Sequence, residues 1–236
     1  MKGTEFIGNL YRLEKPTFTI KDAARIIGKN ENYTRLFINR LKKGGRIKEI
    51  EGGKYTILTE PLPIASNIIF PSYISFITAL SYYGLITQLP LVILVASLKP
   101  KKGLNIMGQE VKFIKLSKER FFGYRKEKVQ GKFIFIAEPE KAVIDSLLLP
   151  TYCPIGEAYN AITSGELGKA KLVEYCLRVN SKVVAKRLGY FLEKAGHEPN
   201  SELIHAINTS YDKLNPSLPS KGKRDKRWRL IINEAV

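Results

Sequence analysis

The longest stretch without a charged side chain, residues 61–98, is the feature that most limits how this chain can fold. The chain as a whole carries a net charge of +17, so such a segment belongs either in a membrane or in a protein core. Pro61, Pro63, Pro71 and Pro90 interrupt it, and no unbroken apolar run reaches the roughly 20 residues that a bilayer requires. We therefore expect a buried helix followed by a buried strand.

Charge is distributed unevenly around this segment. Residues 1–60 contain thirteen Lys+Arg against seven Asp+Glu, a net of +6, and residues 99–132 contain eleven against three, a net of +8. The Pro-Leu-Pro sequence at 61–63 is typical of a domain boundary, because proline ends regular structure and stiffens a linker. The sequence predicts two domains, residues 1–60 and residues 64–236.

The net charge, with a pI near 9.8, indicates a polyanionic partner. Cys153 and Cys176 are too few for a disulfide scaffold, and the first residues include Lys2 and Glu5 without an apolar signal segment. We expect a cytoplasmic protein.

The first domain shows the order of a winged helix-turn-helix. Apolar spacing, glycines and prolines predict a helix near Phe6–Leu13, a strand at 17–20, helices at 20–27 and 31–43, and strands at 46–50 and 54–58. A short turn, Gly28-Lys29-Asn30, joins the second and third helices. In this motif the third helix projects and enters the major groove of DNA.

Polar side chains on that third helix and beside it are the candidate DNA contacts. Asn32, Arg35 and Asn39 are the candidate base readers, because Asn matches an adenine edge and Arg a guanine edge. The other candidates contact phosphates, flank the helix or lie on the wing: Lys29, Asn30, Tyr33, Lys42, Lys43, Lys48 and Lys54.

Other interpretations of the same residues remain open at this stage. Winged helices also bind proteins, and a basic helix face is often simply solvated. Arg40 could pair with Glu31 or Glu49, and Tyr33 could pack in the core.

The sequence as a whole predicts an α+β fold. After the winged helix-turn-helix we expect a larger mixed α/β C-terminal domain that contains a small sheet and several helices. We expect a helix that opens at Pro71–Ser75 and closes at Gly84, and helices that start at Pro139 and cover 168–179 and 181–195. Strands are expected at 89–98, 111–116 and 132–137.

Several motifs spread over the chain resemble the AbiEi-type antitoxin family of transcriptional regulators. They are Pro71–Ser75 with Ala79–Leu85, Phe121–Tyr124, Ala137–Ala142, Arg187–Glu193 and Arg227–Leu230. The resemblance implies a winged helix joined to an α/β domain, and a repressor of its own operon that opposes a nucleotidyltransferase-like toxin. Residue 83 departs from the family, which tends to have His where this chain has Tyr83.

The sequence offers no catalytic constellation, and we expect no enzyme activity, metal or cofactor. His197 and His205 are eight residues apart, beyond helical i, i+4 reach. Glu138, Glu140 and Lys141 faintly resemble a metal-dependent nuclease, but their spacing departs from the usual acid-x-Lys arrangement. Glu140 and Asp145 fit the exposed side of a helix more simply.

Two further groups of cations are candidate phosphate contacts, or else solvated loops: Lys99, Lys101 and Lys102, and Lys221, Lys223, Arg224, Lys226 and Arg227. The leading hypothesis is an autorepressor that binds an inverted repeat in duplex DNA as a dimer or as paired monomers. The alternatives are an interaction module that contacts the toxin directly and a nucleic-acid enzyme.

Overall fold

Local signals set the elements of the N-terminal domain in the computed structural model, which describes all residues from 1 to 236. In chain order they are α1 (Gly3–Arg12), β1 (Phe18–Thr19), α2 (Ile20–Ile27), α3 (Glu31–Lys43), β2 (Lys48–Glu51) and β3 (Lys54–Thr56). The strands form an antiparallel sheet in the order β1-β3-β2. A core that includes Phe6, Phe18 and Ile38 joins the helices to the sheet, and the winged helix-turn-helix order is confirmed.

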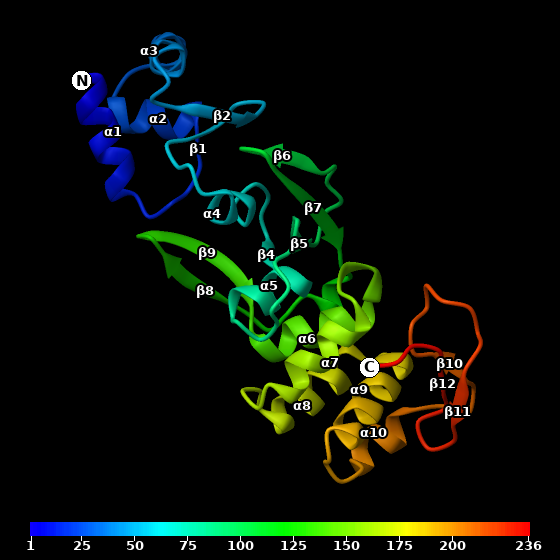
Figure 1. Ribbon diagram of the computed structural model, residues 1–236. Helices are drawn as coiled ribbons and strands as arrows, with labels where there is room; N and C mark the ends of the chain where they lie inside the picture. Colours follow the sequence, from blue (N-terminus) through cyan, green and yellow to red (C-terminus); the bar gives the residue numbers. More distant parts are fainter.

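A six-stranded mixed sheet with the order β6-β7-β5-β4-β9-β8 forms the middle of the molecule (Figure 1). Its elements and their neighbours are α4 (Pro61–Ala65), β4 (Ser72–Ile74), α5 (Phe76–Tyr82), β5 (Val92–Ser97), β6 (Leu104–Ile106), β7 (Gln109–Lys115), β8 (Tyr124–Val129) and β9 (Lys132–Ala137). The helix that we expected to open at Pro71–Ser75 is wrong at its start. Ser72 pairs with Ser97 and Ile74 with Ile136, so strands distant in sequence hold this segment extended.

Helices and a small sheet form the C-terminal end. The elements are α6 (Pro139–Leu148), α7 (Ile155–Thr163), α8 (Lys169–Val179), α9 (Lys182–Lys194), α10 (Ser201–Ala206), β10 (Asp212–Lys213), β11 (Lys223–Asp225) and β12 (Leu230–Ile232). The last three strands pair in the order β10-β12-β11. The predicted α+β class, with a larger C-terminal part, is confirmed.

Burial on both faces of the six-stranded sheet explains the uncharged segment. Ile93 and Val95 of β5 pack with α4, whereas Leu94 and Ala96 join the large core beneath the C-terminal helices. This alternation is the period of two that a strand imposes. The expected buried helix and buried strand are α5 and β5. None of the helices is long and apolar enough to cross a membrane.

Candidate nucleic-acid interface

Side-chain caps mark the starts of α2 and α3, and a left-handed glycine between them ends α2. Thr19 and Asp22 form a capping box at the start of α2, with N–H to oxygen distances of 2.9 and 3.2 Å. Gly28, at φ 70°, ends that helix in the left-handed region. The Asn30 Oδ1 atom then accepts a hydrogen bond from the Tyr33 N–H at 2.9 Å. Asn30, a predicted DNA contact, therefore has its side-chain oxygen engaged as the N-cap of α3.

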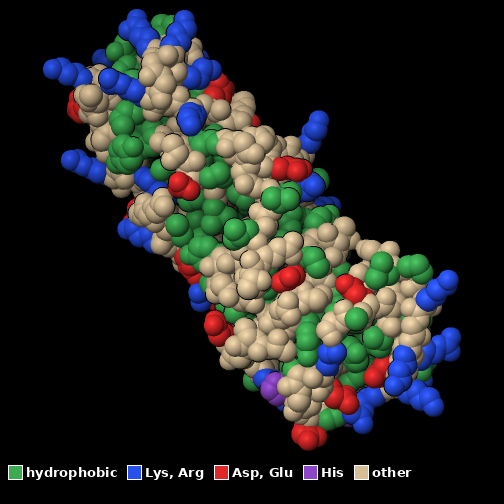
Figure 2. All heavy atoms as spheres, in the orientation of Figure 1, with side chains coloured by type: hydrophobic (Ala, Val, Ile, Leu, Met, Phe, Trp, Pro, Cys, Tyr) green, Lys and Arg blue, Asp and Glu red, His purple; other side chains and the backbone are tan.

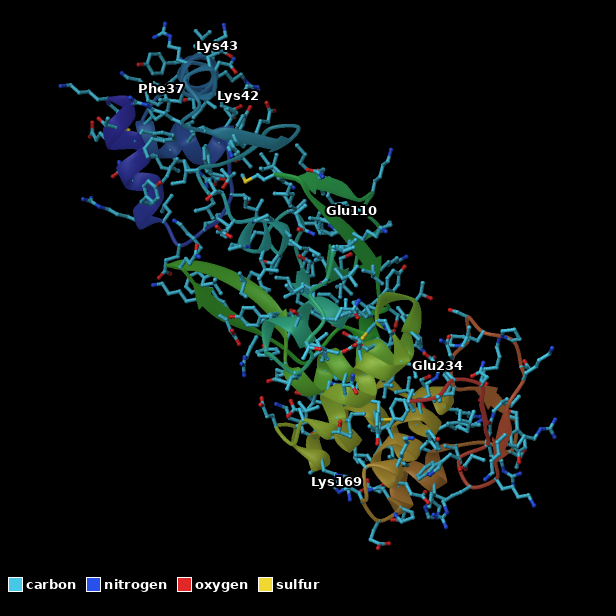
Figure 3. The ribbon with its side chains drawn as sticks, in the orientation of Figure 1. Phe37, Lys42, Lys43, Glu110, Lys169 and Glu234 are labelled. Atoms are coloured by element: carbon cyan, nitrogen blue, oxygen red, sulfur yellow. The ribbon has the colours of Figure 1, made fainter.

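Helix α3 has one buried face and one exposed face. Thr34, Ile38 and Leu41 are buried against the rest of the domain. The exposed side chains are Asn32, Tyr33, Arg35, Leu36, Asn39, Arg40, Lys42 and Lys43. Helix α3 is the outermost element at its end of the molecule, where the labelled Lys42 and Lys43 also lie (Figures 1 and 3). All three predicted base readers thus reach solvent from the same element.

Two of the cations that the sequence predicted as DNA contacts on α3 are paired with carboxylates, whereas one that it did not predict is unpaired. Arg35 lies 3.4 Å from the Glu31 carboxylate, and Lys42 lies 2.6 Å from Glu49. The hydrogen bond to Glu49 raises the pKa of Lys42, which stays charged. Arg40 has no carboxylate within 4 Å, so neither of the ion pairs considered for it forms. Arg40 is therefore a candidate base or phosphate contact that the sequence analysis missed.

Leu36 is a second candidate contact that the sequence analysis missed. Its side chain is 62% exposed, an unusual position for Leu on a polar helix. It lies four residues after Asn32 and four before Arg40, which places the three on one helix face. That spacing was the signal available in the sequence. An exposed apolar group among base readers fits the methyl group of thymine.

Tyr33 is not part of the core. It is 47% exposed, and its ring stacks on Phe37 with the centroids 6.5 Å apart. The ring therefore flanks the outward face of α3 instead of supporting it from beneath.

The wing is the hairpin of β2 and β3. Of its two predicted DNA contacts, one side chain is exposed and the other is turned toward the rest of the protein. Lys48 on β2 is exposed. The Lys54 ammonium instead donates to Glu51 at 3.0 Å and to the Ile68 carbonyl. Lys101, a second predicted phosphate contact, also donates to Glu51, at 2.5 Å. Lys101 therefore ties Glu51 of the wing to the loop after β5, and Lys54 ties the wing to the segment between α4 and β4 through the Ile68 carbonyl.

Solvent exclusion around Glu51 opposes its ionisation, but the hydrogen bonds from Lys101 and Lys54 outweigh that effect. The pKa of Glu51 consequently lies below its ordinary value. The wing and the large sheet are joined by an ionised carboxylate between two cations.

A second connection between the domains lies at the end of α1. The Lys132 side chain is buried, and its ammonium donates to the carbonyls of Leu10 and Tyr11 at 3.0 Å and to that of Leu13. These are carbonyls at the end of a helix, where a cation is favourable. Burial lowers the pKa of Lys132. This ammonium and the Glu51 group hold the winged helix to the large sheet on two sides.

Of the remaining predicted phosphate contacts, Lys29 adjoins α3, exposed in the turn before that helix. Lys99 and Lys102 are exposed on the loop after β5. Lys221, Lys223, Arg224, Lys226 and Arg227 are exposed too, but they belong to β11 and the segments on either side of it. This small sheet lies at the opposite end of the molecule from α3 (Figure 1). Lys and Arg side chains gather at both ends of the face seen in Figure 2.

The residues of the nuclease hypothesis are arranged differently from our expectation. Asp145 is fully buried and Glu140 is 8% exposed, so the prediction of an exposed helix side is wrong. Asp145 accepts hydrogen bonds from the Tyr73 and Ser75 hydroxyls at 3.1 and 2.8 Å and from the Lys141 ammonium. Lys141 is consequently directed into the core to satisfy a carboxylate.

The two other acidic residues near α6 share one lysine. The Lys171 ammonium lies 3.3 Å from Glu138 and 3.5 Å from Glu140. No group of three His, Cys, Asp or Glu side chains that could hold a metal ion occurs in the chain.

Comparisons with known proteins identify a fold but no family. No family model and no curated protein matches this chain. The chain is similar to the solved structure of the RV2827C protein from Mycobacterium tuberculosis, with a TM-score of 0.68 and 13% sequence identity. The match covers 96% of this chain and 89% of that one. At this identity the similarity shows that both domains share an overall arrangement with that protein.

Proposed function

We propose that this protein is a transcriptional repressor that binds duplex DNA through the outward face of α3. The observation that carries the proposal is that face itself. Asn32, Leu36, Asn39 and Arg40 are exposed together on a helix whose other side is buried. An α-helix fits the major groove, where these side chains can read base edges.

Each side chain has a role that its chemistry supports. Asn32 and Asn39 match the donor and acceptor of adenine, and Arg40 matches the two acceptors of guanine. Lys29 and Lys43, exposed and without an acidic partner within 4 Å, supply phosphate contacts that add affinity without sequence information. The net charge of +17 favours the same partner.

The finer role in this proposal is that of an AbiEi-type antitoxin. Its support is the set of motifs that runs in family order from Pro71 to Leu230. In that role the protein acts in the cytoplasm, binds an inverted repeat upstream of its own gene, and opposes a nucleotidyltransferase-like toxin. Two copies on the two half-sites match the symmetry of such an operator.

Fluorescence anisotropy with the DNA upstream of the gene tests the DNA-binding proposal. Asn39→Ala and Arg40→Ala should each weaken binding to that duplex by roughly 5- to 100-fold, the effect of losing one bidentate base contact. Binding to an unrelated duplex should change much less for Asn39→Ala, since Asn39 carries no charge. Asn160→Ala, on the exposed side of α7, is the matched control.

Two results would contradict the proposal. One is equal affinity of the wild-type protein for upstream and unrelated DNA at physiological salt. The other is unchanged upstream binding by both α3 variants. The antitoxin role has its own test. If a nucleotidyltransferase gene lies beside this one, cells that express that enzyme should grow only when this protein is also present.

A further inference from the structure

Six cations lie close together at the end of the molecule farthest from α3. We call them the C-terminal basic cluster: Lys221, Lys223, Arg224, Lys226, Arg227 and Arg229. The one acidic residue among positions 221–229 is Asp225, whose Oδ1 atom accepts the Trp228 backbone N–H at 2.7 Å. The acid is therefore engaged in holding the turn that carries the cations.

A buried anchor holds this cluster at the surface. Trp228 is fully buried, and its Nε1–H donates to Glu193 at 2.6 Å. Lys223 and Arg224 belong to β11, an edge strand of the small sheet, and both are exposed to solvent. The buried Trp228 and the small sheet therefore hold the cluster in a folded segment, whereas a basic tail would have no such support.

Most charges of the cluster have no internal partner. Arg227 forms an ion pair with Glu193. Lys221, Lys223, Arg224 and Lys226 are exposed, and none has a carboxylate within 4 Å. Four uncompensated cations on one short segment raise the local positive potential, which attracts a polyanion.

The side chains around the cluster favour phosphates over bases. Arg224 and Arg229 lie over the ring of Tyr211, at 5.2 and 5.7 Å from its centroid. Trp228 is buried and Tyr211 already stacks with two guanidinium groups, so neither ring is offered as a platform for an unpaired base. Proteins that bind single strands combine cations with such stacking platforms. The surface instead fits the phosphate backbone of a duplex.

The position of the cluster separates it from the α3 interface. The outward face of α3 and the small sheet lie at opposite ends of an elongated molecule, and the labelled Lys43 lies at the α3 end (Figures 1 and 3). A duplex seated on α3 lies beyond that end and leaves the cluster accessible to another segment of nucleic acid.

We propose that the C-terminal basic cluster is a second, sequence-independent binding surface for duplex DNA, which allows one molecule to hold two duplex segments. The bridging role rests on the proposed function of α3, whereas duplex binding by the cluster does not. Each phosphate that the cluster neutralises should add about −0.9 to the slope of log K against log salt concentration.

A bead assay tests bridging directly. The upstream duplex is fixed to beads, protein is added, and capture of a second, fluorescent duplex of unrelated sequence is measured at low salt. The wild-type protein should capture it. The variant K221Q/K223Q/R224Q/K226Q should bind the beads normally but capture at least tenfold less. K115Q/K118Q/K182Q/K194Q removes the same number of exposed charges elsewhere and should capture like the wild-type.

Further arms separate the possible causes. The single α3 variants should lose affinity for the upstream duplex. When the four cluster cations are also replaced in these variants, the slope of log K against log salt concentration for the remaining duplex binding should become shallower by roughly 4. That arm still reports on the cluster if the repressor proposal fails. Normal capture by the cluster variant would overturn the proposal and indicate bridging by a dimer through two α3 helices. Tighter binding of the cluster to single-stranded RNA than to duplex DNA would also overturn it.

Discussion

Replacing Lys132 with Met should loosen the winged helix from the large sheet. The substitution keeps most of the buried stem but removes an ammonium that donates to three carbonyls of the α1 terminus. The Leu10 carbonyl contact is buried, and leaving it unpaired costs about 1–3 kcal/mol. Water can reach the other two, which add about 0.5–1.5 kcal/mol each. Relief of the buried charge offsets part of this sum, so we expect a net loss of about 3 kcal/mol.

Calorimetry and amide hydrogen exchange measure the effect. A loss of that size should lower Tm by roughly 6–12 °C for a chain of this length, and exchange in α1 should accelerate more than exchange in α6. Lys128→Met, on the same hairpin, removes only an exposed ion pair with Glu14 and should cost at most about 1 kcal/mol. An unchanged Tm with unchanged protection of α1 in Lys132→Met would refute the assignment of Lys132 as an interdomain support.

Three other changes test the packing and the electrostatics. Asp145→Ala should lower the free energy of unfolding by about 3–5 kcal/mol in urea titrations, because the buried Lys141 ammonium loses its carboxylate. Gly189→Ala places a Cβ 2.1 Å from the ring of Trp228, so we expect a loss of at least about 1–3 kcal/mol and altered fluorescence of the single tryptophan. The lowered pKa of Glu51 means that its stabilisation is present above about pH 4.3 and is lost as the pH falls through the folded-state value. The Tm of the wild-type should therefore fall more steeply with acid than that of Glu51→Gln, and parallel curves would contradict this.

The N-terminal elements could be predicted because their signals are local. The start of α2 depends on Thr19, and the boundary between α2 and α3 depends on Gly28 and Asn30. Each of them acts on backbone groups within four residues of itself. The same reasoning placed Pro139 at the first turn of α6.

Long-range contacts explain what the sequence did not reveal. Ser72–Ile74 is a strand because β5 and β9 supply its hydrogen-bonding partners. Asp145 can be buried because the Lys141 ammonium neutralises its charge and the hydroxyls of Tyr73 and Ser75, some seventy residues earlier, donate hydrogen bonds to it. Lys54 and Lys101 were predicted as phosphate contacts from their charge. Only their partners, the Ile68 carbonyl for Lys54 and Glu51 for Lys101, show that they join the domains.

The central claim is that duplex DNA binds the exposed face of α3. Thiol alkylation of a Leu36→Cys variant tests this claim most directly. The native Cys153 and Cys176 are at most 1% exposed, and burial raises the pKa of each thiol to about 12, so the new thiol should react alone. Saturating upstream duplex should slow its alkylation at least tenfold, while an Asn160→Cys control keeps its rate. An equal alkylation rate at position 36 with and without the duplex would contradict the proposal that the outward face of α3 contacts DNA.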